Sequence, residues 1–122
     1  MNRDQLQELA ERIEAASGLD VDLAVAALRA MRDALPEASS EVRPGVVESA
    51  DMALHLVVRM LPGWSVALQG IAREPGRWTC TLQPSGARDD EEVIGIGHAP
   101  TAPLALLVAL LRVVVIQAKG YR

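Results

Sequence analysis

The chain has 122 residues, of which 50% are hydrophobic and 2% aromatic, so its apolar mass is aliphatic. This length suits one domain, and the apolar content excludes a chain that is disordered throughout. Twelve Lys and Arg against sixteen Asp and Glu give a formal net charge of −4, which argues against nucleic-acid binding through a basic field. The single cysteine excludes a disulfide framework and a cysteine-based zinc site.

The sequence contains no recognisable signal for secretion or membrane insertion, which favours the cytoplasm. The opening residues are rich in acids and contain no apolar signal core, so secretion is not predicted. The longest apolar stretch, residues 104–116, is interrupted by Arg112 and is shorter than the roughly 20 residues that a bilayer requires. A lone Cys80 fits a reducing compartment. We therefore expect a cytoplasmic protein with no membrane contact.

The first 35 residues predict a helical hairpin. Apolar residues recur at helical spacing over residues 2–18 and 20–35. Gly18 is placed to end the first helix, Asp20 is a good N-cap for the second, and Pro36 stops it. Residues 36–48 are expected to be a linker between the hairpin, residues 1–35, and the main body, residues 49–122.

The body begins with a predicted helix over residues 49–61. Its polar side chains form one narrow stripe, Asp51, His55 and Arg59, at a spacing of four residues. The other positions are apolar and cover most of the helix circumference. Such a helix is expected to be covered on more than one side.

Three short strands are predicted next, over residues 64–71, 77–83 and 92–97. In the second strand, Trp78, Cys80 and Leu82 alternate with polar residues and are expected to face inward. In the third strand, Ile94 and Ile96 are expected to face inward and Gly95 and Gly97 outward. The short connections favour an antiparallel meander, and the two tryptophans, Trp64 and Trp78, are expected to pack against helices.

The last predicted helix spans residues 101–119. Thr101 is expected to cap it, and Pro103 falls in the first turn, where its missing N–H is harmless. Residues 104–116 are apolar almost all the way round, which predicts the central helix of the fold or half of a subunit interface. The predicted fold class is therefore α+β: a helical hairpin followed by α-β-β-β-α, with a three-stranded antiparallel meander packed on helices in a single compact domain.

Three blocks of sequence look familiar. Residues 9–23 read LAERIEAASGLDVDL, residues 61–64 read LPGW, and residues 99–106 read APTAPLAL. The first block resembles the opening of many small bacteriophage and prophage proteins, and the other two are similar to the phage ABA sandwich domain group. The resemblance implies a phage- or prophage-encoded cytoplasmic protein with an α/β sandwich. It implies no activity, because the group is largely uncharacterised, so there are no catalytic, cofactor or metal residues to carry over.

The histidines and the cysteine are weak candidates for chemistry. His55 lies on the polar stripe of its helix, which is typical of a solvated face with weak pairing at i, i+4. His98 follows the third predicted strand and is expected at a sheet edge near the start of the last helix, where a binding role is the alternative to a structural one. Cys80 is expected to be a buried, inert thiol. The sequence therefore predicts no catalytic, metal or cofactor site.

Two loops are the remaining candidates for a functional site. Gly95-Ile96-Gly97 before a helix faintly resembles a phosphate loop but lacks the other residues of either phosphate-binding motif. Four consecutive acids follow a polar loop, and they can be a soluble turn or an acidic contact surface toward a basic partner. The candidate partner-contact residues are Asp89, Asp90, Glu91, Glu92 and His98.

These observations predict a small non-enzymatic protein that acts through protein–protein contacts, with a second copy of itself as the expected partner. One alternative is an inhibitor of a host defence system that uses the acidic surface, and a second is an enzyme of unrecognised type. The order α-β-β-β-α also resembles the double-stranded-RNA-binding fold. Residues 99–103, at the start of the last helix, contain no Lys, so we expect no nucleic-acid partner.

Overall fold

A computed structural model describes residues 3–16, 21–34, 40, 42–71, 77–84 and 95–118. Its elements follow in the order α1 (Arg3–Ala15), α2 (Val21–Ala34), the 3₁₀ helix η2 (Pro44–Val47), α3 (Ala50–Met60), β1 (Trp64–Ile71), β2 (Arg77–Pro84), β3 (Gly95–Ala99) and α4 (Ala102–Ala118). The three strands form one antiparallel sheet in the order β1-β2-β3. The predicted α+β fold class and the meander are confirmed.

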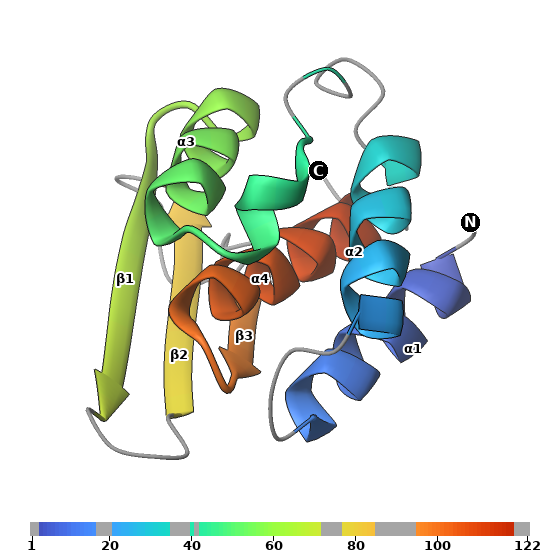
Figure 1. Cartoon of the computed structure of the whole chain (residues 1–122). Helices are drawn as coiled ribbons and strands as arrows, with labels where there is room; N and C mark the ends of the chain where they lie inside the picture. The colour runs from blue at the N-terminus through green and yellow to red at the C-terminus, as the bar shows by residue number, and fades with distance from the viewer. Residues whose placement is uncertain are drawn as a thin grey trace.

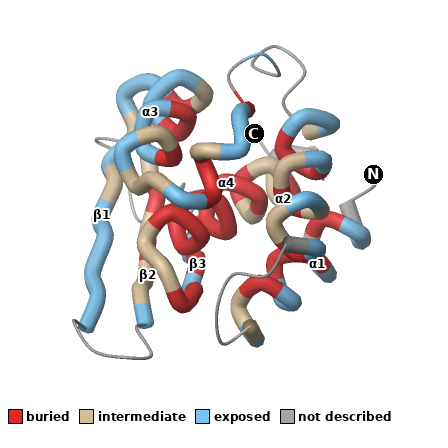
Figure 2. Tube along the Cα trace, in the orientation of Figure 1, coloured by how far each residue is buried: buried red, intermediate tan, exposed pale blue. Residues whose placement is uncertain are grey.

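The apolar helix α4 is the centre of the molecule. It runs between the sheet on one side and the α1–α2 pair on the other (Figure 1). Every residue from Pro103 to Leu111 is buried, as the continuous red of α4 in Figure 2 shows. The Thr101 hydroxyl accepts a hydrogen bond from the Leu104 N–H at 3.4 Å, so the predicted cap is confirmed. Of the two roles predicted for α4, central helix and interface helix, the burial within one chain supports the first.

The segment expected to be a linker is partly packed into the core. Within residues 36–48 the chain forms η2, and Val42, Val46 and Val47 are buried in the same hydrophobic cluster as α1, α2 and α4. The Arg32 guanidinium of α2 donates two hydrogen bonds to the Val42 carbonyl, at 3.0 and 3.1 Å. Residues 42–47 therefore join the hairpin to the body instead of separating them.

The third strand is turned over relative to the prediction. Gly95, Gly97 and Ala99 are buried against α4, whereas Ile96 and His98 are exposed; Ile94 lies outside the described residues. A Cβ atom on Gly97 would lie 2.5 Å from the Ala109 nitrogen, so β3 and α4 approach too closely for a side chain. Backbone proximity, not hydrophobicity, decides which face of β3 is inside.

Helix α3 is covered on one side only, so the predicted burial on several sides is wrong. Ala53, Leu56 and Val57 are buried. Leu54 and Val58, however, are 39% and 54% exposed. These two residues are one helical turn apart and therefore share one face. Within the described residues, the apolar surplus of α3 faces solvent.

Candidate functional site

Helices cover one face of the sheet, and the other face is open to solvent. Trp78, Cys80 and Leu82 face the helices as predicted, with Cys80 and Leu82 fully buried. The intervening residues of β2 are polar and point to the other face, which is solvated, as is common in antiparallel sheets, and which also carries the exposed Ile71 and Ile96. A shallow hollow of 570 Å³ on this open side is lined by Gln69, Gly70, Ile71, Arg77 and Thr79.

His98 lies on β3, an edge strand of the sheet, which confirms its predicted place. Its side chain is on the open face, and the Nδ1 atom lies 2.9 Å from the Thr79 hydroxyl oxygen on β2. Its backbone N–H points out of the sheet edge and donates to Glu14 Oε2 at 2.9 Å. The imidazole thus pairs with a threonine, while the nearby carboxylate binds the backbone.

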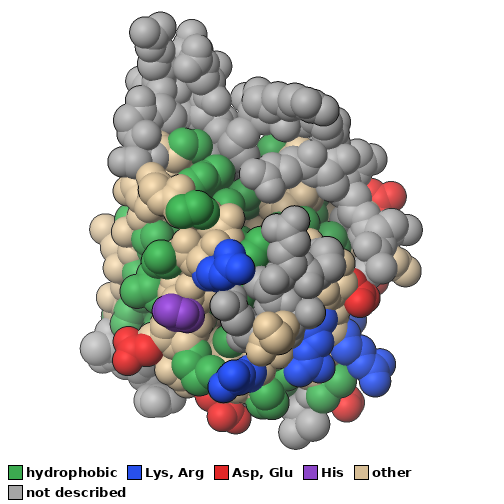
Figure 3. Space-filling model, turned by 90° about the horizontal axis from the view of Figure 1, so that it is seen from above, with side chains coloured by type: hydrophobic (Ala, Val, Ile, Leu, Met, Phe, Trp, Pro, Cys, Tyr) green, Lys and Arg blue, Asp and Glu red, His purple; other side chains and the backbone are tan. Residues whose placement is uncertain are grey.

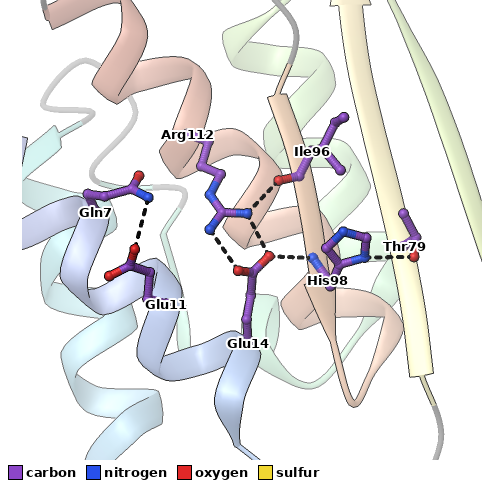
Figure 4. A network of polar contacts seen from close by, with 7 residues as sticks. All are labelled: Gln7, Glu11, Glu14, Thr79, Ile96, His98 and Arg112. Atoms are coloured by element: carbon purple, nitrogen blue, oxygen red, sulfur yellow. Dashed lines mark hydrogen bonds and ion pairs between the residues drawn. The ribbon is translucent and has the colours of Figure 1, made fainter.

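A bidentate ion pair occupies the β3 edge. The Arg112 guanidinium of α4 contacts both carboxylate oxygens of Glu14 on α1, at 2.6 and 2.7 Å, and its Nη1 also donates to the Ile96 carbonyl at 2.8 Å. Figure 4 shows the two side chains pointing toward each other beside β3. Glu14 accepts from His98 and Arg112 donates to Ile96, so the pair substitutes for the N–H and C=O of a neighbouring strand.

The environment of Glu14 favours its ionised form. The side chains of Glu14 and Arg112 are 17% and 22% exposed. Burial raises the pKa of Glu14, but the hydrogen bonds from Arg112 and from the His98 backbone, with the charge of Arg112, outweigh it and leave the pKa below its ordinary value of 4.5. The ion pair is therefore formed throughout the neutral range.

This pKa makes one contribution to stability depend on pH. Because the pKa of Glu14 is lower in the folded chain, ionised Glu14 stabilises the fold above pH 4.5, and this contribution is lost as pH falls through the folded pKa. We expect the stability advantage of the wild type over Glu14→Gln to shrink when pH is lowered from about 6 to about 3. Urea unfolding of both proteins at each pH measures it. An advantage that does not change with pH would contradict the assignment.

His55 lies elsewhere, in a separate hollow. It lines a 420 Å³ depression beside α3 together with Arg43, Asp51, Met52 and Leu56, and its side chain is exposed. The depression combines an arginine, a histidine and one acid with the apolar side chains of Met52 and Leu56. Over the part of the chain that the structure describes, no group of three or more His, Cys, Asp or Glu residues is placed to hold a metal ion.

Cys80 is a packing residue. It is fully buried between β2 and the helices, and burial raises the pKa of its thiol to about 12. The thiol is therefore protonated at neutral pH and is a poor nucleophile. The phosphate-loop interpretation of residues 95–97 has no support either, because both glycines face α4. The acidic candidates Asp89, Asp90, Glu91 and Glu92 lie outside the described residues.

The structure brings together residues that are far apart in the sequence. Of the five candidate contact residues, His98 alone is described, and its backbone N–H binds Glu14, which in turn pairs with Arg112. Arg112 carried a usable signal, since a single cation inside an apolar, buried helix requires a partner. Nothing in the sequence identified Glu14 as that partner among the acids of α1.

Comparisons with known proteins give no relative for this chain. No family model, no curated protein and no solved structure matches it. In the described ranges, none of the helices has both the length and the apolar character needed to cross a bilayer.

Proposed function

We propose that this chain is a small non-enzymatic protein that acts through protein–protein contact, and that its partner is a second copy of itself. One observation carries the proposal: large aliphatic side chains are exposed on α3 and β1. Leu54 and Val58 belong to α3, whereas Leu68 and Ile71 are 37% and 53% exposed on β1. Figure 3 shows hydrophobic side chains gathered on the side of the molecule where α3 and β1 lie in Figure 1.

The energetics favour a partner at this surface. Single exposed aliphatic residues are common in monomeric proteins, but here two lie one turn apart on α3 and two more lie near the end of β1, and exposed apolar surface of this kind can mark an interaction site. Full burial of one such side chain contributes about 1.5–3 kcal/mol. A partner that buries two or three of these side chains therefore recovers several kcal/mol, which offsets the entropy lost on association.

The origin of the protein is part of the proposal. The blocks at residues 9–23, 61–64 and 99–106 resemble bacteriophage and prophage proteins, and this resemblance is the support for a phage- or prophage-encoded chain that acts in the cytoplasm. The residues on which a defence-inhibitor role would depend, 89–92, lie outside the described ranges. Self-association is therefore the function that the described surface supports best.

Light scattering coupled to size-exclusion chromatography tests the proposal. We expect the measured mass to approach twice 13.1 kDa as the concentration rises from about 1 to about 200 µM, a range that reveals micromolar dissociation constants. A mass that stays at that of one chain at every concentration would overturn self-association.

A further inference from the structure

The two edges of the sheet differ in what their outward-facing backbone groups contact. At the β3 edge, the His98 N–H and the Ile96 carbonyl already bind Glu14 and Arg112. At the β1 edge, no strand of the described chain pairs with the outer side. Exposed edge strands are templates for pairing with another chain, and proteins commonly block them with charges, prolines or bulges. One edge is blocked in this way by an ion pair.

The alternation of backbone groups identifies what the β1 edge presents. In β3, even-numbered residues direct their N–H and C=O groups out of the sheet, as Ile96 and His98 show. The antiparallel register carries the alternation through β2, so the even-numbered residues of β1 also point outward. The Trp64 N–H agrees, because it donates to the Leu61 carbonyl at 3.1 Å and not to β2. Val66, Leu68 and Gly70 therefore offer their backbone groups to a neighbour.

Strand β1 carries none of the usual blocking features. Its sequence, WSVALQGI, contains no charged residue and no proline, and it pairs with β2 residue for residue from Trp64 to Ile71 without a bulge. All residues from Ala67 to Ile71 are exposed. The strand is therefore neutral, free of bulges and accessible along its second half.

We propose that β1 pairs antiparallel with β1 of a second copy about a two-fold axis at Leu68, which joins two three-stranded sheets into one of six strands. The inference rests on the proposed self-association and adds its surface and geometry. In this register Leu68 lies opposite its counterpart and Val66 lies opposite Gly70. Each outward-facing residue of the three is then matched with an outward-facing residue, as a symmetric interface requires.

A second copy fits this edge better than a charged peptide does. Like charges directly opposite each other destabilise a strand pair, and a self-pair of β1 contains none, although the chain as a whole carries a net charge of −4. The pairing also places the partly exposed Leu68 side chains, which share the helix-covered face of the sheet with Cys80, against each other. A Cβ atom on Gly70 would lie 2.3 Å from the Trp78 ring, so the Val66 side chain of the second copy, opposite Gly70, lies beside this ring.

Two matched variants test whether the β1 edge is the dimer interface. Leu68→Lys and Leu54→Lys make the same substitution at residues that are 37% and 39% exposed, so their effects on folding of one chain are comparable. We expect Leu68→Lys to weaken dimerisation by at least about tenfold, because two lysines then face each other across the axis. Leu54→Lys is expected to leave the dissociation constant within about twofold, since surface substitutions away from a contact have small effects. Sedimentation equilibrium measures both constants.

Hydrogen exchange of the wild type provides a test that needs no variant. On raising the concentration through the dissociation constant, we expect amide exchange to slow at Val66, Leu68 and Gly70 and to stay unchanged at Ala67 and Gln69, which face β2. The β1–β1 pairing would be overturned if dimerisation were lost in Leu54→Lys and kept in Leu68→Lys. It would also be overturned if exchange at Leu68 did not depend on concentration. Either result would leave the proposed self-association intact. A wild type that stays monomeric would overturn both.

Discussion

Gly97→Ala is expected to lower the free energy of unfolding by about 3 kcal/mol, which is at the upper end for overpacking of a protein core. The added Cβ would lie 2.5 Å from the Ala109 nitrogen and 2.6 Å from the Ala105 carbonyl oxygen. Both obstacles are backbone atoms of α4, so no side-chain rotation relieves the overlap and β3 must move away from the helix. Urea unfolding followed by circular dichroism measures the loss, which is a large part of the 5–15 kcal/mol of an ordinary domain.

Gly63→Ala is the control for this prediction. Gly63 has a φ of +83°, and a Cβ there meets nothing within 4 Å. The substitution therefore adds conformational strain alone, about 1–2 kcal/mol. We expect the loss at Gly97 to exceed the loss at Gly63. Equal losses, or a smaller one at Gly97, would show that β3 and α4 are not in the close contact described.

Arg112→Leu is expected to cost about 3 kcal/mol of stability, because removal of one partner leaves a charge buried without compensation. The leucine fits an apolar helix, but Glu14 then keeps a carboxylate at 17% exposure with the His98 N–H as its remaining described donor. The Ile96 carbonyl also loses its guanidinium donor. Chemical unfolding at neutral pH measures the cost.

A double variant and a second arginine control the interpretation. In Glu14→Gln/Arg112→Leu the amide oxygen can still accept from His98 and no charge is left unpaired, so we expect this protein to be more stable than Arg112→Leu alone, by about 1–2 kcal/mol. Arg32→Leu removes a guanidinium that donates to the Val42 carbonyl from an exposed position, and its expected cost is about 1 kcal/mol. An Arg112→Leu cost no larger than this would contradict a structural role for the ion pair.

Local patterns in the sequence predicted most of the elements. Helical spacing of apolar residues predicted α1 and α2, and a polar stripe at a spacing of four residues predicted α3. The cap Thr101 and the long apolar run after it predicted α4. The alternation of Trp78, Cys80 and Leu82 predicted β2 and its buried face. These signals depend on neighbours within a few positions, and the structure agrees with them. The order of strands followed because short connections join antiparallel neighbours.

The features that the sequence did not predict depend on distances between remote segments. Whether Ile96 or Gly97 faces inward depends on how closely α4 approaches β3, and a hydrophobicity pattern contains no such distance. Likewise, Glu14 and Arg112 are 98 positions apart, and α1 contains several acids that could equally have been the partner. The exposure of Leu54 and Val58 depends on which elements cover α3, which its own periodicity does not determine.

The ion pair at the β3 edge also limits the size of any assembly built by strand addition. A sheet that is open at both edges can add copies without end and grow into a filament, whereas one that is open at a single edge closes after one addition. With Glu14 and Arg112 in place, growth through β1 stops at two chains. In the proposed dimer, α1 would therefore end further strand addition, and loss of its carboxylate would expose the second edge to further copies.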